Sequence, residues 1–113
     1  MITTLKLQER ITLPVILRFL PQGGYVKFQT AENIKKKVSV TSEELEELEV
    51  MDMPDGTTRW NARKDVGKEY EFNEVELSVI RSALDELDRR EMVTWDVMPL
   101  YKIFKESEPP KEE

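Results

Sequence analysis

The chain has 113 residues, which suits one domain with a single hydrophobic core, and its 35% of charged residues indicates a heavily solvated surface. It contains no histidine and no cysteine, which excludes Ser-His-Asp and Cys-His catalysis, zinc fingers, disulfide frameworks and thiol redox chemistry. The formal net charge of −6 opposes binding to nucleic acid and to anionic membranes, since both depend on positive charge.

The first twenty residues predict an extended segment followed by a helix. Residues 2–7 alternate loosely, as in a short strand or an extended lead-in. From Gln8 to Leu20 apolar side chains recur at helical spacing, but Pro14 would cost about 3 kcal/mol in a helix interior. Two alternatives stay open: a long helix kinked at the proline, or a shorter helix with Thr12 as N-cap and the proline in its first turn.

Two further helices are predicted before residue 49. The Pro-Gln-Gly-Gly segment at 21–24 ends the first helix. Residues 25–38 have helical spacing of apolar side chains, although their first four also alternate as in a strand. Thr41 and Glu44 can form a capping box, which predicts a short helix that ends near Leu48.

A hairpin and the longest helix are predicted next. Residues 49–61 are typical of a β-hairpin, since Pro-Asp-Gly in their middle favours a tight turn. Residues 69–72 alternate and could add a third strand to that hairpin. Asn73 and Glu76 can form a second capping box, and the helix that follows to about residue 90 has a continuous apolar stripe.

Together these elements predict an α+β fold that is mainly helical, with four or five helices and a β-hairpin. A last helix is expected to end at Phe104, with Pro99 in its first turn. Residues 1–105 would form a single globular domain, and residues 106–113, which lack apolar side chains, a disordered acidic tail. The order of three helices followed by a hairpin resembles that of winged-helix domains.

The sequence favours a cytoplasmic protein without a membrane partner. Its first residues lack the charged and then apolar order of a signal peptide. The longest apolar cluster, residues 13–20, is interrupted by Pro14 and Arg18 and is too short to span a bilayer.

Two surface features are candidates for binding a protein partner. Acidic residues gather between 43 and 55 without an intervening base, and such a cluster could face a basic protein, imitate phosphates or form a solvated helix face. The ligand spacing of an EF-hand is missing from it. An arginine followed by a tryptophan comes after the predicted turn, and both types are frequent in binding hot spots. The predicted partner-binding residues are Glu43, Glu46, Glu47, Arg59 and Trp60.

Lys35, Lys36 and Lys37 form the only basic run and are the candidate nucleic-acid contacts in a winged-helix interpretation. In that family the third helix enters the major groove. Here the third predicted helix and its end carry five glutamates among residues 43–49, which would repel phosphate. Nucleic acid is therefore the less favoured partner.

No residue is nominated as catalytic, and no metal or cofactor is expected. Carboxylate-pair catalysis needs two acids a few Å apart, and the sequence singles out no such pair. The remaining polar aromatics (Tyr25, Trp95 and Tyr101) are assigned to packing. The sequence thus predicts a non-enzymatic interaction protein, with a small-ligand-binding (sponge) protein as a further alternative.

Three short segments occur together in a familiar order. They are Leu20-Pro21-Gln22-Gly23-Gly24 after the apolar helix, Thr41-Ser42-Glu43-Glu44 at a helix start, and Arg59-Trp60-Asn61 after the turn. In these segments the chain, over residues 7–104, resembles small uncharacterised proteins of phage and prophage genomes. The resemblance implies no activity but favours a phage accessory protein that binds or inhibits a host protein in the host cytoplasm. Homo-oligomerisation through an amphipathic face stays open.

Overall fold

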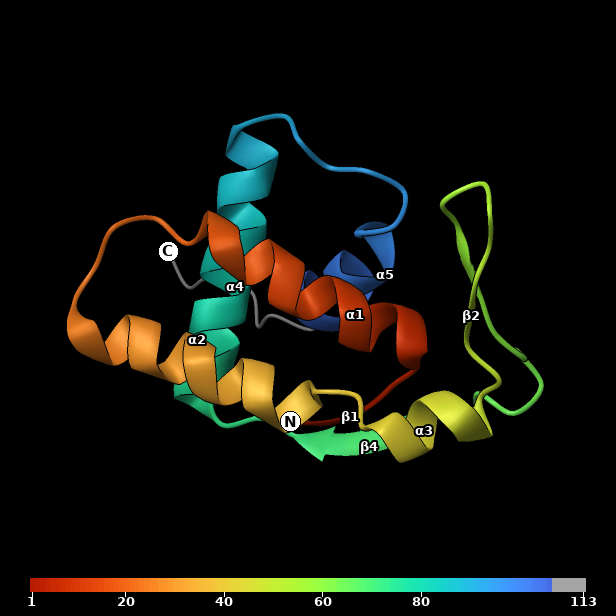
Figure 1. Ribbon diagram of the computed structural model, residues 1–113. Coiled ribbons are helices and arrows are strands. Elements are labelled where there is room, and N and C mark those ends of the chain that lie inside the picture. The colour runs from red at the N-terminus through yellow and green to blue at the C-terminus, as the bar shows by residue number, and fades with distance from the viewer. Residues whose placement is uncertain (107–113) are drawn as a thin grey trace.

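The computed structural model describes residues 1–106, and helices make up most of this part of the chain (Figure 1). In chain order the elements are β1 (Ile2–Leu5), α1 (Leu7–Ile16), η1 (Leu17–Phe19), α2 (Tyr25–Val38), α3 (Ser42–Glu47), β2 (Met51–Asp52), β3 (Thr58–Arg59), β4 (Lys68–Glu71), α4 (Glu74–Arg89), α5 (Met98–Leu100) and η2 (Tyr101–Lys105). η1 is a 3₁₀ turn and η2 a π-helical turn. The predicted mainly helical α+β fold with a hairpin is confirmed, while the predicted disordered tail (106–113) lies outside the described residues except for Glu106.

The core lies where α4 packs against α1, η1 and α2. The capping box predicted at Asn73 and Glu76 starts α4, with both of its hydrogen bonds present at 2.8–3.0 Å. The predicted apolar stripe of α4 is buried: Leu77, Ile80, Ala83, Leu84 and Leu87. From the C-terminal side, Phe104 closes this core and meets Phe72 edge to face, with ring centroids 5.5 Å apart. Residues from both ends of the described chain thus belong to one continuous apolar core.

Helix α1 runs through Pro14, so the longer of the two predicted helices forms and Thr12 is not an N-cap. The proline lies two residues before the end of α1, where the chain tightens into the 3₁₀ turn η1. Because proline has no N–H, the helix lacks the hydrogen bond from residue 14 to the carbonyl oxygen of residue 10, and α1 ends two residues later. Thr12 lies inside the helix, and its hydroxyl donates to the Gln8 carbonyl oxygen at 2.7 Å. Burial of Leu13 and Ile16 on the core face offsets the cost of the proline.

Residues 69–72 do not extend the hairpin, contrary to the prediction. β4 pairs antiparallel with β1, with Ile2 opposite Glu71 and Leu5 opposite Lys68. β2 and β3 pair only with each other. The physical reason is burial: β4 turns Tyr70 into the helical core, and the exposed hairpin offers no apolar surface for that side chain.

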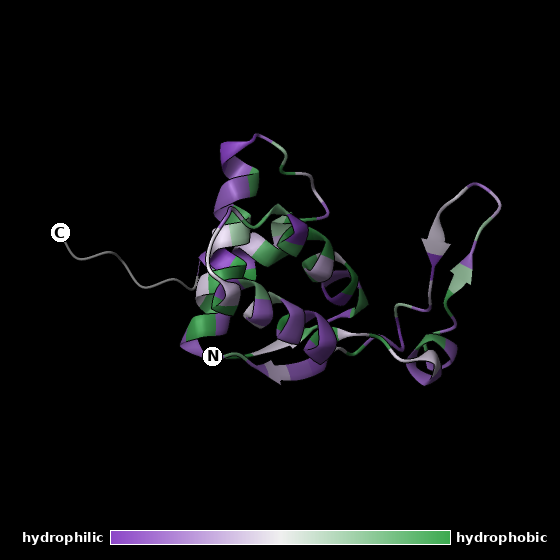
Figure 2. Ribbon diagram, turned by 60° about the vertical axis from the view of Figure 1, so that its left-hand side comes forward, coloured by the Kyte–Doolittle hydropathy of each residue, from purple (hydrophilic) through white to green (hydrophobic). Residues whose placement is uncertain are grey.

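The order of three helices followed by a hairpin is present, as predicted. However, α3 has only six residues, and none of them is buried. Figure 2 shows α3 and the hairpin standing apart from the other helices. Within the described residues, no helix has both the length and the apolar composition needed to cross a bilayer.

Candidate interaction surface

Residues 41–66, here called the arm, comprise α3, β2, β3 and their connecting loops (Figures 1 and 2). None of these 26 residues is buried, whereas the flanking Val38 and Tyr70 both belong to the core. The conformation of the arm therefore depends on hydrogen bonds and ion pairs rather than on a core of its own.

Helix α3 is defined at both ends by local hydrogen bonds. At its start, the predicted capping box forms between Thr41 and Glu44, with both bonds at 3.2 Å. At its end, Glu49 adopts a φ of 56°, and the N–H of Val50 donates to the Leu45 carbonyl oxygen at 3.0 Å. This is the Schellman arrangement, which satisfies the carbonyls left free at a helix end.

The hairpin is fastened to the end of α3. The backbone N–H of Asn61 donates to the Leu48 carbonyl oxygen at 2.8 Å, and its side-chain amide donates to the Glu49 carboxylate at 3.1 Å. Lys64 adds an ion pair to the same carboxylate at 3.2 Å. These contacts make α3 and the hairpin one unit.

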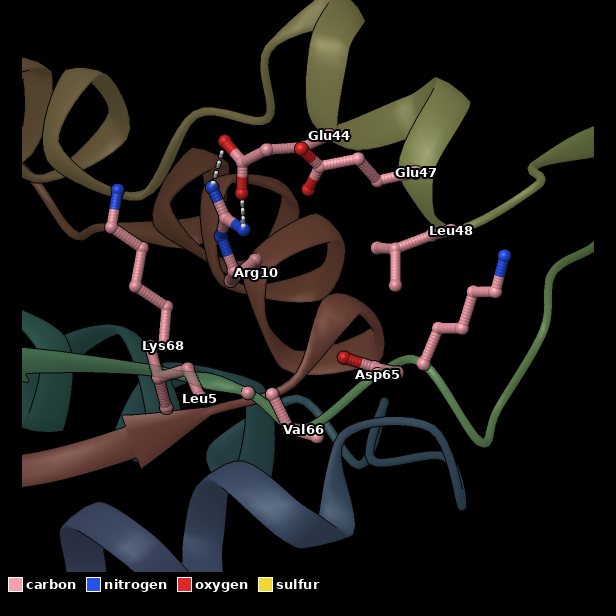
Figure 3. A pocket seen from close by; sticks show the side chains of 10 residues that line it. Leu5, Arg10, Glu44, Glu47, Leu48, Asp65, Val66 and Lys68 are labelled. Carbon is pink, nitrogen blue, oxygen red and sulfur yellow. Dashed lines mark hydrogen bonds and ion pairs between the residues drawn. The ribbon is translucent and has the colours of Figure 1, made fainter.

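Arg10 of α1 forms the first tether between the arm and the helical body. Its side chain is only 4% exposed, and its guanidinium makes a bidentate ion pair with Glu44 (Figure 3). The remaining donors reach the carbonyl oxygens of Ser39 at 2.7 Å and Val38 at 3.2 Å. Hydrogen bonding to the guanidinium lowers the pKa of Glu44 to about 2. One arginine thus holds both the α2–α3 connection and the start of the arm.

Asp65 forms the second tether, at the other end of the arm. Both of its carboxylate oxygens lie 3.2 Å from the backbone nitrogen of Leu7, which donates to them. Leu7 is the first residue of α1, where backbone N–H groups lack helical partners and the helix dipole favours a negative charge. Both ends of the arm are therefore anchored on the first turn of α1 by polar contacts.

A small pocket lies between the two tethers (Figure 3). Its charged lining is balanced, since three acidic residues face three basic ones: Glu44, Glu47, Asp65, Arg10, Lys64 and Lys68. Most of these groups already have partners in the arm or the body. The pocket consequently gives no preference for a charged ligand of either sign.

The structure places all five predicted partner-binding residues on the arm. Glu43, Glu46 and Glu47 are exposed and lie on one side of α3, because their spacing is three and four residues. Arg59 is exposed on β3, and Trp60 follows it partly buried. The arm contains eight acidic and three basic residues, so it carries five of the six net negative charges of the chain.

The lysine run lies elsewhere, in the last turn of α2. Lys37 is bound to the body, since its ammonium lies 2.6 Å from the Glu76 carboxylate and 2.9 Å from the Glu71 carbonyl oxygen. Successive residues on a helix point about 100° apart, so Lys35, Lys36 and Lys37 do not form one basic face. Among the described residues, no hydrogen bond or ion pair joins these lysines to the residues of the arm that were predicted to bind a protein.

Sequence reasoning missed three residues that matter for this surface. Arg10 lies on the buried stripe of α1, and a charged residue among apolar ones at helical spacing was the available signal. Asp65 gave no local signal because its partner is 58 residues away. Trp95 was assigned to packing, but it is 87% exposed, and Tyr25 is also exposed.

In residues 1–106 no group of three or more acidic side chains is placed to hold a metal ion. No family model, curated protein or solved structure matches the chain. The resemblance to phage and prophage proteins stays a prediction.

Proposed function

We propose that the protein is a non-enzymatic interaction module that binds a basic surface of a protein partner through the arm. The observation that carries this proposal is a 26-residue projection with no buried residue and with five of the chain's six net negative charges. Ordering a backbone costs about 1–2 kcal/mol per residue, and the arm, whose residues are exposed or half-buried, recovers little of this by burial in its own chain. A partner that covers the arm would supply that burial.

The charge of the arm favours a protein partner over nucleic acid. The exposed glutamates of α3 would repel a phosphate backbone, whereas they complement a surface rich in lysine and arginine. Arg59 and Trp60 add the residue types that dominate binding hot spots. In keeping with the resemblance to phage proteins, we propose a host protein in the cytoplasm as the partner and its inhibition as the consequence of binding.

The test is capture from a bacterial lysate treated with nuclease, with quantitative mass spectrometry of the bound proteins. The variant carries Glu43→Lys, Glu46→Lys and Glu47→Lys on the arm. The matched control has the same net charge but reverses three exposed glutamates of the body, in Glu32→Lys, Glu69→Lys and Glu106→Lys.

The wild type and the control are expected to retain one dominant stoichiometric protein, and the arm variant to lose it at least about tenfold. Circular dichroism on all three proteins confirms that they are folded. Equal capture by both variants, or capture of nothing by the wild type, would contradict the proposal.

A further inference from the structure

The loop between α4 and α5 presents an unusual side chain. Trp95 is 87% exposed, although tryptophan ordinarily buries most of its large apolar surface. Val93 and Met92 beside it are partly exposed, and Val93, Trp95 and Met98 line a shallow hollow. Tryptophan is among the residue types that dominate binding hot spots, so its exposure here points to an interaction site.

Backbone hydrogen bonds of the loop hold Trp95 in its exposed position. The N–H of Met92 donates to the Leu87 carbonyl oxygen at 3.0 Å, which closes the end of α4. The N–H of Val97 donates to the Thr94 carbonyl oxygen at 3.1 Å, and Val97 itself is buried in the core. Trp95 is therefore held outward by a turn whose next apolar residue is fixed inward.

The charges around Trp95 identify the chemistry of an occupant. The two arginines that precede the loop, Arg89 and Arg90, are bound to the carboxylate of Glu86. These two arginines remain exposed and share that one carboxylate, but residues 86–96 contain four acidic and two basic side chains, and the exposed Glu91 and Asp96 flank the tryptophan in the sequence. An indole ring with carboxylates beside it suits an arginine side chain, which can stack on the ring and pair with an acid.

The loop and the arm lie on the same side of the molecule. In Figures 1 and 2 the loop after α4 is on the side of the body that faces the hairpin. Both the loop and the arm expose acidic groups, and each of them holds one of the two tryptophans of the chain.

We infer that Trp95 is a second contact for the same basic partner: an arginine of that partner stacks on Trp95 while the arm binds the adjoining part of its surface. This inference rests on the proposed function, because it assigns the loop to the partner of the arm. The chemical class of the occupant is an arginine-containing protein segment.

The two tryptophans make separate fluorescence reporters. Trp60→Phe leaves Trp95 as the only reporter on the loop, and Trp95→Phe leaves Trp60 as the only reporter on the arm. The probe is an acetylated and amidated hexa-arginine peptide, with hexa-glutamate as the charge control. We expect both reporters to respond to hexa-arginine with the same Kd and neither to respond to hexa-glutamate.

An affinity variant completes the test. Trp95→Ala, read with Trp60, is expected to weaken hexa-arginine binding about fivefold, as for loss of a cation–π contact. Tyr25→Ala is the matched control, because Tyr25 is an equally exposed aromatic at the start of α2, at the end of the body away from the hairpin (Figure 1). Thermal unfolding should be unchanged in both variants.

A response of Trp60 alone, or an unchanged Kd in Trp95→Ala, overturns the inference and leaves the arm as the proposed binding site. If the fluorescence of neither tryptophan changes with hexa-arginine, the inference is also overturned, and the capture experiment then decides the proposed function independently.

Discussion

At the scale of single residues, Glu49 and Glu91 occupy backbone positions that favour glycine. Each has a φ of 56° just after a helix end, and a side chain in this left-handed region costs about 1–2 kcal/mol. We expect Glu91→Gly to raise the free energy of unfolding by about 1 kcal/mol, measured by urea denaturation. Glu49→Gly should raise the free energy of unfolding by less, because it also removes the bonds of the Glu49 carboxylate to Asn61 and Lys64. A loss of stability in Glu91→Gly would show that its carboxylate is engaged in the folded protein.

Tyr70 presents a second case at this scale. Its ring is buried between β4 and the helices, and its hydroxyl finds no hydrogen-bond partner among the described residues. Burial of that hydroxyl raises the pKa of Tyr70. Because an unsatisfied buried polar group costs about 1–3 kcal/mol, Tyr70→Phe should leave stability unchanged or raise it by about 1 kcal/mol. The midpoint of urea unfolding measures this, and a marked decrease would mean that the hydroxyl is bonded in solution.

At the scale of elements, Arg10 joins α1, the end of α2 and the start of α3. Arg10→Met keeps the apolar volume but removes the donor of the Ser39 carbonyl and leaves the Glu44 carboxylate with only its bonds from Thr41. Breaking a buried ion pair on one side costs about 3–5 kcal/mol, so a loss near the lower end is expected in the free energy of unfolding. Arg10→Lys should be intermediate, since an ammonium keeps the charge but cannot bond in a fork. Equal stability of the wild type and Arg10→Met would show that the arm does not depend on this tether.

The elements also show what the sequence can and cannot predict here. The starts of α3 and α4 were predictable because Thr41 and Asn73 bond to residues three positions away. The pairing of β4 with β1 could not be predicted. Alternation identifies a strand but does not say which strand it pairs with, and β1 lies more than sixty residues earlier in the chain. The separation of the arm from the body could not be predicted for the same reason. Whether a hairpin packs on the body depends on contacts between residues far apart in the sequence, such as that of Asp65 with Leu7.

At the scale of the whole molecule, acid should weaken the fold through two carboxylates. Arg10 lowers the pKa of Glu44 to about 2, and Arg89 and Arg90 lower that of Glu86 to about 2. Because both values are below the ordinary 4.5 of an unfolded glutamate, the stabilisation is complete above pH 4.5 and is lost as the pH falls toward 2. Urea unfolding at several pH values measures this loss. Glu44→Gln should make the profile shallower, and an unchanged profile would contradict the assignment.

The arm and the body differ in what holds them, so they should also differ in how they open. α4 lies in the continuous apolar core, whereas the arm has no buried residue and is tethered at Arg10 and Leu7. Segments with few buried contacts open locally at a lower free energy than the global value. We therefore expect the hairpin amides to exchange with deuterium well before those of α4, measured residue by residue by NMR. Arg10→Lys should speed exchange in both parts, because this tether is lost on opening of the arm and on global unfolding alike, and the hairpin amides should remain the faster ones. If the hairpin amides exchanged as slowly as those of α4, the arm and the body would be one cooperative unit, and the arm would be packed more firmly than its polar tethers imply.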